Sequence, residues 1–267
     1  MGIPNLPRAD YGIDAPSVVR NLALIGIACM SGGLSARLLL ATTQPRISTV
    51  LLICGLAAGC CFLFTFGLMV WSSKVGKLLF REELIDSLAL HGEETVLDVG
   101  CGRGLLLNGA ARRLTTGKAI GVDVWQSQDQ SGNSPEVTLA NARAEEVATR
   151  VEIRTADMRK LPLPDETVDV AISNIAIHNI PDRQGRDEAV REIARVLKTG
   201  GQVALVDLRA VGQYAQALKG LGWQDVSVSG LRFKIFPPVR TVRGRKPKPA
   251  ASFLLNSSFL NLTLQQE

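Results

Sequence analysis

Uncharged residues dominate the first part of the chain, and alternating apolar and polar stretches follow. Residues 47–73 form a run of 27 residues without a charge. As a helix this run would extend roughly 40 Å, more than the roughly 30 Å hydrocarbon core of a bilayer. Trp71, Lys74 and Lys77 at its end are an aromatic and basic anchor typical of a membrane interface. The pattern therefore predicts a membrane span over about 47–71.

A second, weaker apolar run precedes the first. Residues 21–36 are uncharged, and the run reaches Ala41 only if Arg37 is included. Arg37 would then extend its charge toward the interface. We expect two spans, over about 21–41 and 47–71. The alternative is a cleaved signal peptide, but the run lacks a clear small-residue cleavage site and another apolar run follows it.

Basic residues flank the two spans unequally. Those outside the spans and their connection are Arg8, Arg20, Lys74, Lys77 and Arg81. The connection is marked only by Arg37 and Arg46. The positive-inside rule then predicts a two-span, multi-pass membrane protein with both termini in the cytoplasm. Gly55 and Gly59 form a small-xxx-small pair that would pack the hairpin, build a homodimer through it, or only reflect membrane composition.

Composition and charge exclude several classes of protein. The 267 residues are 46% hydrophobic and 21% charged, with a mean hydropathy of +0.16, so a disordered chain is excluded. The net charge of +5 is concentrated near the C-terminal end, which argues against a globally basic nucleic-acid binder. The five cysteines include no C-x-x-C pair and the chain has two histidines, so we expect no metal site and a reducing compartment.

After residue 74 the pattern changes to alternating strands and helices. Predicted strands cover residues 95–99, 118–124, 151–155, 168–173, 202–207, 223–229 and 233–244. Predicted helices cover residues 81–90, 105–114, 135–149, 183–197 and 211–219. This alternation predicts an α/β fold with a mostly parallel sheet covered on both faces. Ligands of such sheets bind at the carboxyl ends of the strands.

A glycine-rich loop lies where the first predicted strand turns into a helix. Gly100, Gly102 and Gly104 permit positive φ and let a ligand approach the backbone closely. A dinucleotide fingerprint needs a glycine where this chain has Leu105. Asp98 would also repel a pyrophosphate, whereas it suits a ligand that carries an ammonium and a sulfonium. S-adenosylmethionine (SAM) is such a ligand.

The chain resembles class I SAM-dependent methyltransferases. The residues that carry the resemblance are 96–104, 121–123, 156–158, 161–170 and 195–201, within roughly residues 77–246. The resemblance implies a Rossmann-like, doubly wound sheet of seven mostly parallel strands, preceded here by two transmembrane helices. It also implies SAM as the cofactor and methyl transfer as the activity. We therefore divide the chain into a membrane anchor (1–74), a methyltransferase domain (75–248) and a tail (249–267).

The resemblance also assigns cofactor-binding residues. They are Asp98, Gly100, Cys101, Gly102, Gly104, Asp123, Val124, Trp125, Asp157, Met158 and Asn174. The glycine loop would hold the methionine part of SAM with Asp98 at its amino group, and Asp123 would accept the ribose hydroxyls. Asp157 would accept from the adenine amino group, or be only a turn residue, and Met158 would pack on the ring or donate its backbone N–H. Trp125 would cover the adenine or ribose, or simply pack in the core.

The fourth predicted strand ends where this family places its methyl-transfer centre. Asn174 and His178 are the candidate catalytic residues. His178 would act as a general base on a hydroxyl or an activated carbon, or else only cap the next segment. The polar loop 126–134 is either a lid over the cofactor or a solvated loop.

The predicted anchor favours an apolar, membrane-partitioned acceptor such as a quinone precursor, a phospholipid or a prenylated compound. One alternative is a water-soluble acceptor, with the hairpin serving only to localise the enzyme. Another is a SAM-binding membrane protein without turnover. The basic residues Arg240, Arg243, Arg245, Lys246 and Lys248 would contact anionic lipid head groups, or be solvated.

Overall fold

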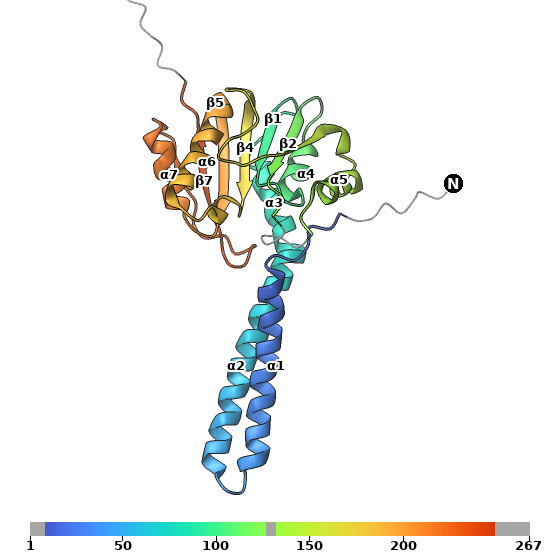
Figure 1. Ribbon diagram of the computed structural model, residues 1–267, viewed down its shortest axis with the longest axis vertical. Coiled ribbons are helices and arrows are strands. Elements are labelled where there is room, and N and C mark those ends of the chain that lie inside the picture. Colours follow the sequence, from blue (N-terminus) through green and yellow to red (C-terminus); the bar gives the residue numbers. More distant parts are fainter. Residues whose placement is uncertain (1–8, 127–131, 249–267) are drawn as a thin grey trace, which may run out of the picture.

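A long helical hairpin projects from an α/β domain (Figure 1) in this computed structural model, which describes residues 9–126 and 132–248. Helices α1 (Pro16–Leu40) and α2 (Pro45–Trp71) form the hairpin. A π-helical turn, η1 (Ser72–Gly76), and helix α3 (Lys77–Asp86) continue α2 into the domain. The predicted tail and residues 127–131 of the polar loop lie outside the described residues.

Close backbone contact holds the two hairpin helices together. A Cβ atom on Gly55 would lie 2.6 Å from the carbonyl oxygen of Cys29 and 2.8 Å from Cα of Gly33. A Cβ on Gly59 would lie 2.9 Å from the carbonyl oxygen of Gly26. The predicted small-residue pair therefore packs within the hairpin, as in many membrane helix pairs. The homodimer stays a prediction.

The outer surface of the hairpin is apolar. Exposed side chains on it include Leu24, Ile27, Leu38, Ile53 and Phe64. By length and composition, both helices of the hairpin could cross a membrane. The first helix begins five residues before the predicted span, because Pro16 occupies its first turn, where proline costs no hydrogen bond.

The domain is built on one twisted sheet in the order β3-β2-β1-β4-β5-β7-β6 among the described residues. Its strands are β1 (Thr95–Val99), β2 (Lys118–Asp123), β3 (Val151–Thr155), β4 (Val168–Asn174), β5 (Leu197–Asp207), β6 (Ser227–Val228) and β7 (Arg240–Arg245). The first five are parallel, and β7 is antiparallel to both β5 and β6. The predicted seven-stranded, mostly parallel fold is confirmed.

Helices cover both faces of the sheet. They are α3, α4 (Leu105–Ala111), α5 (Pro135–Ala144), α6 (Arg183–Val196) and α7 (Val211–Gly220), with short 3-10 turns η2 (Ala148–Arg150) and η3 (Ile177–Asn179). Successive residues of β1 point to opposite faces. Val96 accordingly packs in the core formed with α3 and α4, and Leu97 packs in the core formed with α6 and α7. The parallel strands thus bring their carboxyl ends to one edge, beside the hairpin.

The last two predicted strands are much shorter than expected. The strand predicted over 233–244 begins only at Arg240, because Pro237 and Pro238 cannot donate to a ladder. The strand predicted over 223–229 is reduced to the two residues of β6. Residues 230–237 instead form a loop that packs against the base of the hairpin.

The basic residues near the C-terminal end do not share one surface. In the ladder between β5 and β7, Arg240 lies opposite Asp207 at the hairpin side of the sheet, and Arg245 lies opposite Gln202 at the other side. Arg245 donates to the carbonyl of Gly200, and the described chain leaves the domain at the end away from the hairpin (Figure 1). The strand carries Arg245, Lys246 and Lys248 away from the hairpin, which favours the solvated alternative for these three residues; the lipid contact stays a prediction.

Candidate functional site

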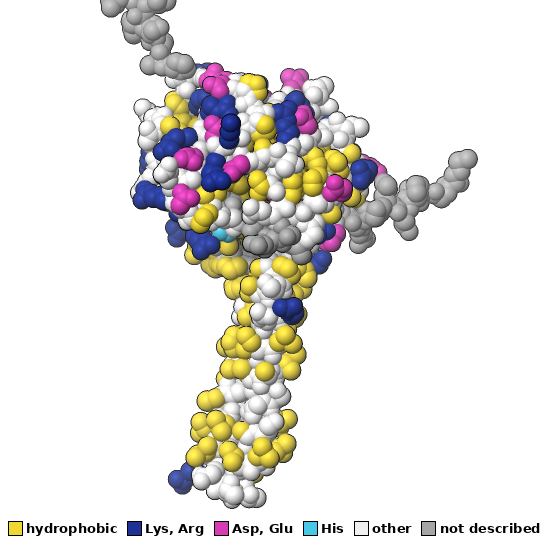
Figure 2. All heavy atoms as spheres, in the orientation of Figure 1, with side chains coloured by type: hydrophobic (Ala, Val, Ile, Leu, Met, Phe, Trp, Pro, Cys, Tyr) yellow, Lys and Arg dark blue, Asp and Glu magenta, His cyan; other side chains and the backbone are white. Residues whose placement is uncertain are grey.

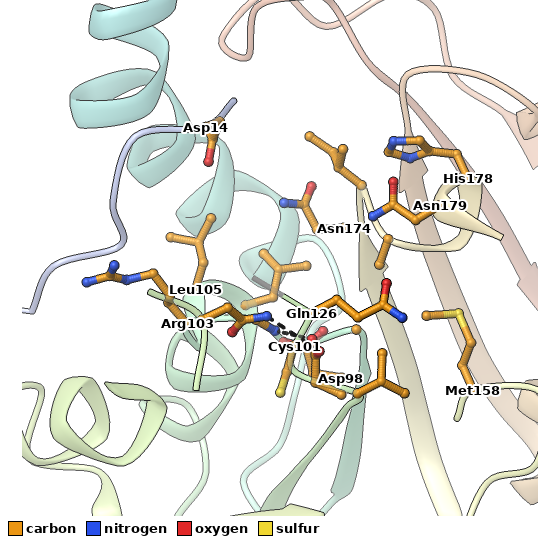
Figure 3. A pocket seen from close by; sticks show the side chains of 18 of the residues that line it. Asp14, Asp98, Cys101, Arg103, Leu105, Gln126, Met158, Asn174, His178 and Asn179 are labelled. Atoms are coloured by element: carbon orange, nitrogen blue, oxygen red, sulfur yellow. Dashed lines mark hydrogen bonds between the residues drawn. The ribbon is translucent and has the colours of Figure 1, made fainter. Parts of the chain in front are cut away.

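A cavity of about 410 Å³ lies at the carboxyl ends of the parallel strands. This volume is within the range of small-molecule sites. Residues after β1, β2, β3, β4 and β5 all contribute to its walls. In Figure 3, Asp98 and Met158 lie toward one end of the cavity, and Asp14 and His178 lie toward the other.

The glycine loop lines one wall of the cavity with its backbone. Gly100, Gly102 and Gly104 have φ angles of 72°, 49° and 83°, the left-handed region that favours glycine. A Cβ on Gly100 would lie 2.2 Å from Cβ of Ala176. A side chain at this position would therefore collide with the loop after β4. Gly104 precedes α4 and does not itself line the cavity.

Asp98 is buried beneath the glycine loop. Burial raises the pKa of its carboxyl to about 8, and the nearby charge of Asp123 adds to the increase. The charged form of Asp98 is therefore disfavoured, and below about pH 8 the carboxyl is mostly protonated. A bound cation would relieve that cost, which is the chemistry expected of a site for an ammonium group.

The carboxylate of Asp123 lies at the end of β2 and organises the loops around it. The backbone N–H of Gly102 donates to Oδ2 at 2.8 Å, and that of Trp125 donates to Oδ1 at 2.7 Å. The side-chain amide of Asn133 donates to Oδ1 at 3.5 Å. A carboxylate has about four acceptor positions, so Asp123 retains capacity for further donors such as hydroxyls.

The third of the predicted acidic site residues, Asp157, is already paired. Arg159 donates through Nε to both carboxylate oxygens at 3.0 Å and through Nη2 at 2.5 Å. These bonds lower the pKa of Asp157. An adenine amino group would have to share this carboxylate with Arg159. Met158 lines the cavity beside it.

Asn174 and His178 lie together at the end of β4. The side-chain Oδ1 of Asn174 is buried and has no hydrogen-bond partner among the described residues. The next residue, Ile175, has a φ of 54°, a rare conformation for a β-branched residue. Such strain and an unpaired buried polar atom are found together mainly at functional sites.

His178 faces a buried carboxylate that the sequence did not single out. Its Nδ1 lies 2.7 Å from Oδ1 of Asp207, although the angle is not that of a hydrogen bond. Tyr214 donates to Oδ2 of Asp207 at 2.9 Å, and the Leu208 N–H donates to Oδ1 at 2.7 Å. Asp207 is therefore fixed in place.

Ten of the predicted site residues line this one cavity. They are Asp98, Gly100, Cys101, Gly102, Asp123, Val124, Asp157, Met158, Asn174 and His178. Two do not: Gly104, as noted, and Trp125, whose indole N–H donates to Thr155 Oγ1 at 2.7 Å and whose ring packs on the core. In this structure Trp125 follows the packing alternative. The described residues contain no group of three potential metal ligands.

The sequence missed the parts of the wall that come from outside the strand ends. Tyr11, Asp14 and Ala15 line the cavity from the N-terminal segment, and Met69 lines it from the end of α2. Ile235, Phe236 and Pro237 line it from the loop before β7. These residues approach the cavity only through contacts between distant parts of the chain, so no local pattern signals them.

A buried lysine holds the N-terminal segment in the wall. Nζ of Lys77 donates to the carbonyl oxygens of Tyr11 at 2.7 Å and Gly12 at 3.0 Å, and to Asp14 Oδ1 at 2.9 Å. Desolvation lowers the pKa of Lys77, opposed by the charge of Asp14. Lys77 was interpreted from the sequence only as an interface anchor. Its three acceptors show that it joins α3 to the segment before α1.

Comparison with known proteins shows what the domain is similar to. Residues 97–205 match the family described as "Methyltransferase domain". The chain is 34% identical over 132 residues to 27-O-demethylrifamycin SV methyltransferase of Amycolatopsis mediterranei, covering 49% of this chain and 44% of that protein. It is 26% identical over 161 residues to demethylmenaquinone methyltransferase of Lactobacillus johnsonii, covering 59% and 58%. The chain thus spans about half the length of the curated relatives it matches.

Solved structures support the same fold. The [4+2]-cyclase SpnF matches with a TM-score of 0.52 and 21% identity, over 63% of this chain and 81% of that one. A SAM-dependent methyltransferase structure from Methanococcus maripaludis matches with a TM-score of 0.51 and 16% identity, over 66% and 87%. At these identities the likeness concerns the fold alone. In both cases the matched portion leaves about a third of this chain uncovered.

Proposed function

We propose that this chain, which carries a class I SAM-dependent methyltransferase domain, transfers the methyl group of SAM to a small acceptor that partitions into a membrane. The observation that carries the proposal is the make-up of one cavity. Met69, from the apolar hairpin, lines the same space as Asp98, Asp123 and His178. Apolar side chains at the hairpin side, which lie beside the Lys77–Asp14 pair, therefore adjoin a polar wall at the strand ends.

The residues present fit SAM. The glycine loop would hold the methionine part, because the backbone of Gly100 and Gly102 lines the cavity without side chains in between. The buried Asp98 would bind the ammonium group and Asp123 the ribose hydroxyls. The unpartnered Oδ1 of Asn174 supplies one further acceptor toward the cavity. Bound SAM supplies a methyl group that is already activated by its sulfonium.

His178 and Asp207 would manage the proton of the acceptor. With Asp207 held by Tyr214 and Leu208, its carboxylate fixes the Nδ1 side of the imidazole and leaves Nε2 to accept a proton. This arrangement suits a hydroxyl or an acidic carbon, both of which lose a proton on methylation. We therefore assign His178 as the general base and Asp207 as its positioning residue.

The apolar wall indicates the kind of acceptor. Met69, Ile235 and Phe236 face the cavity next to the end of α2. An acceptor with a hydrocarbon portion would bury that portion against this wall, with its reactive group toward His178. Relatives named for rifamycin and demethylmenaquinone methylation act on bulky organic molecules by their names, which is compatible with this class.

In this proposal residues 1–74 anchor the enzyme, residues 75–248 form the catalytic domain on the cytoplasmic side, and both spans cross the membrane. The closely packed glycines act within one hairpin, so a homodimer is not required for the anchor. No nucleic acid or metal takes part.

The test uses the full-length chain in lipid nanodiscs with radiolabelled SAM, offered the organic-phase or the aqueous extract of the host cell. We expect label to move into the organic phase. Asp123→Ala should abolish transfer and SAM binding, and Asp207→Asn should reduce transfer while SAM still binds. Label only in aqueous products would contradict a membrane acceptor. Binding without any transfer would instead favour a SAM-binding protein without turnover.

A further inference from the structure

Residues 230–237, here called the junction loop, pack against the rod, which is the continuous helix formed by α2, η1 and α3. The backbone N–H of Phe236 donates to Ser72 Oγ at 2.8 Å. A Cβ on Gly76 would lie only 1.8 Å from the carbonyl oxygen of Lys234, so the loop backbone touches the rod directly. Arg232 and Lys234 both pair with Glu83 of α3.

The junction loop has two apolar faces that point in different directions. Ile235 and Phe236 line the cavity. Leu231 and Phe233 point outward and are 48% and 68% exposed. A single exposed apolar residue is ordinary, but these two are not isolated.

Neighbouring residues of the rod extend the exposed apolar surface. Val75 and Leu79, which precede and follow Gly76 in the rod, are 43% and 49% exposed. Figure 2 shows hydrophobic side chains gathered where the hairpin meets the domain. Surfaces of this kind in proteins mark a contact with another apolar phase.

The distance of the junction loop from Trp71 along the rod indicates which part of a bilayer would contact this apolar surface. Trp71 ends α2 and is 44% exposed, as expected for an interface anchor. Gly76, against which the loop packs, follows five residues later, or about 7.5 Å along a helix. The head-group layer of a bilayer is roughly 5 to 8 Å thick on each side. The junction loop therefore lies at the depth of the head groups if the hairpin spans.

We propose that the junction loop is a second membrane contact, which inserts Leu231 and Phe233 into the phospholipid interface beside the hairpin. Arg232 and Lys234 alternate with these residues; they share the one carboxylate of Glu83 and remain about half exposed, so positive charge is left to meet lipid phosphates. The opposite face of the same loop is a wall of the cavity, so an acceptor leaving the lipid meets Ile235 and Phe236 at once. This inference rests on the proposed anchoring of the hairpin.

The experiment uses quenching of tryptophan by brominated phospholipids in vesicles that contain the full-length protein. Phe233→Trp places a reporter in the junction loop. Leu221→Trp is the matched control, because Leu221 is a comparably exposed residue, 41%, at the end of α7 that lies away from the strand ends. The parent protein has Trp71, Trp125 and Trp223; Trp71 ends α2, whereas Trp125 and Trp223 pack in the domain, so bromolipid quenching of the parent reports on Trp71. We expect Phe233→Trp to add emission that is quenched, and Leu221→Trp to add emission that is not quenched.

Two results would overturn the inference, and they are distinguishable. Quenched Trp71 with unquenched emission at position 233 would refute the loop contact and leave the anchor intact. Unquenched Trp71 would refute the anchor itself, and the loop contact with it. As a second readout, the double variant L231S/F233S should lower methyl transfer to the organic-phase extract in nanodiscs severalfold and leave SAM binding unchanged, whereas Leu221→Ser should change neither.

Discussion

At the scale of single residues, the buried Asp98 carries an unusual cost that only a ligand removes. Its pKa of about 8 in the ligand-free protein is far above that of an ordinary aspartate, because burial disfavours the charged form. A neutral amide in its place would fit the burial better and the ammonium group worse. Stability and binding are therefore opposed at this position.

We predict that the affinity for S-adenosylhomocysteine (SAH), the reaction product, which retains the ammonium group, rises between pH 6 and pH 8 and is level above about pH 8. Below that pH Asp98 must release a proton before it pairs with the cation, which limits the slope to about tenfold per pH unit. Calorimetric titration at several pH values measures the effect. Asp98→Asn should bind weakly with no such slope; a slope that persists in this variant would place its origin elsewhere.

The same pKa shift makes a prediction for stability. In the unfolded chain Asp98 ionises near pH 4, whereas burial in the native state keeps its carboxyl protonated up to about pH 8. Between these two pH values the free energy of unfolding therefore falls as the pH rises, and above about pH 8 this loss is constant. Asp98→Asn should therefore raise the melting temperature of the ligand-free protein more at pH 8 than at pH 5. An equal change at both pH values would show that the substitution acts through packing.

The pair His178–Asp207 allows a sharper test of the catalytic assignment. Asp207→Asn keeps an acceptor for the surrounding N–H groups but loses the charge beside Nδ1. We predict a loss in kcat of about 10²-fold, the lower range for general-base catalysis, with SAH affinity unchanged. Tyr214→Phe, which removes one bond to Asp207, should cost less. Parallel losses of kcat and SAH binding would indicate a structural role instead.

At the scale of secondary-structure elements, the hairpin depends on the absence of side chains at its centre. Gly55 meets only backbone atoms of the facing helix, which cannot move aside as a side chain can. Gly67, on the same helix, has nothing within 4 Å of the position of a Cβ. The two glycines therefore form a matched pair for substitution.

Gly55→Val should separate the two helices and destabilise the protein in detergent by about 1–3 kcal/mol, the usual cost of overpacking. Gly67→Val should be nearly neutral. Thermal unfolding of the two variants, followed by far-UV circular dichroism, compares them directly. Similar melting temperatures for both would mean that the hairpin is held by something other than this contact.

The elements that sequence reasoning predicted well are those with a local signal. The strand-end residues Asp98, Asp123 and Asn174 could be placed at one site because parallel strands present their carboxyl ends at one edge. The junction loop could not, since Leu231, Phe233 and Ile235 alternate with polar residues as a strand would. Its true position is decided by contacts with Ser72 and Gly76, more than 150 residues earlier in the chain.

At the scale of the whole molecule, the two hairpin helices, the N-terminal segment and the domain meet at the base of the hairpin. Lys77 connects the three, because it lies at the start of α3 and its ammonium group donates to the segment that lines the cavity. Lys74, one turn earlier, makes only an exposed pair with Asp10. The charge of Lys77 therefore holds the N-terminal segment against the domain, whereas the charge of Lys74 forms a solvent-exposed ion pair.

We predict that Lys77→Met lowers the free energy of unfolding by about 2 kcal/mol, the order expected for losing charged hydrogen bonds, and weakens SAH binding. Lys74→Met should cost no more than about 0.5 kcal/mol, as for most surface ion pairs. Chemical denaturation and calorimetry on both variants check this. Faster cleavage of the N-terminal segment by a protease in Lys77→Met alone would locate the change; equal effects of the two substitutions would contradict it.

The N-terminal wall of the cavity also has a consequence for biogenesis. Residues 11–15 leave the ribosome before either hairpin helix, whereas every strand-end residue of the site is made afterwards. The cavity is complete only when the newly made domain packs against residues 11–15 across the base of the hairpin. Activity therefore begins only after the last strand-end residues have been made and folded, and a nascent chain that stops before them holds half a site.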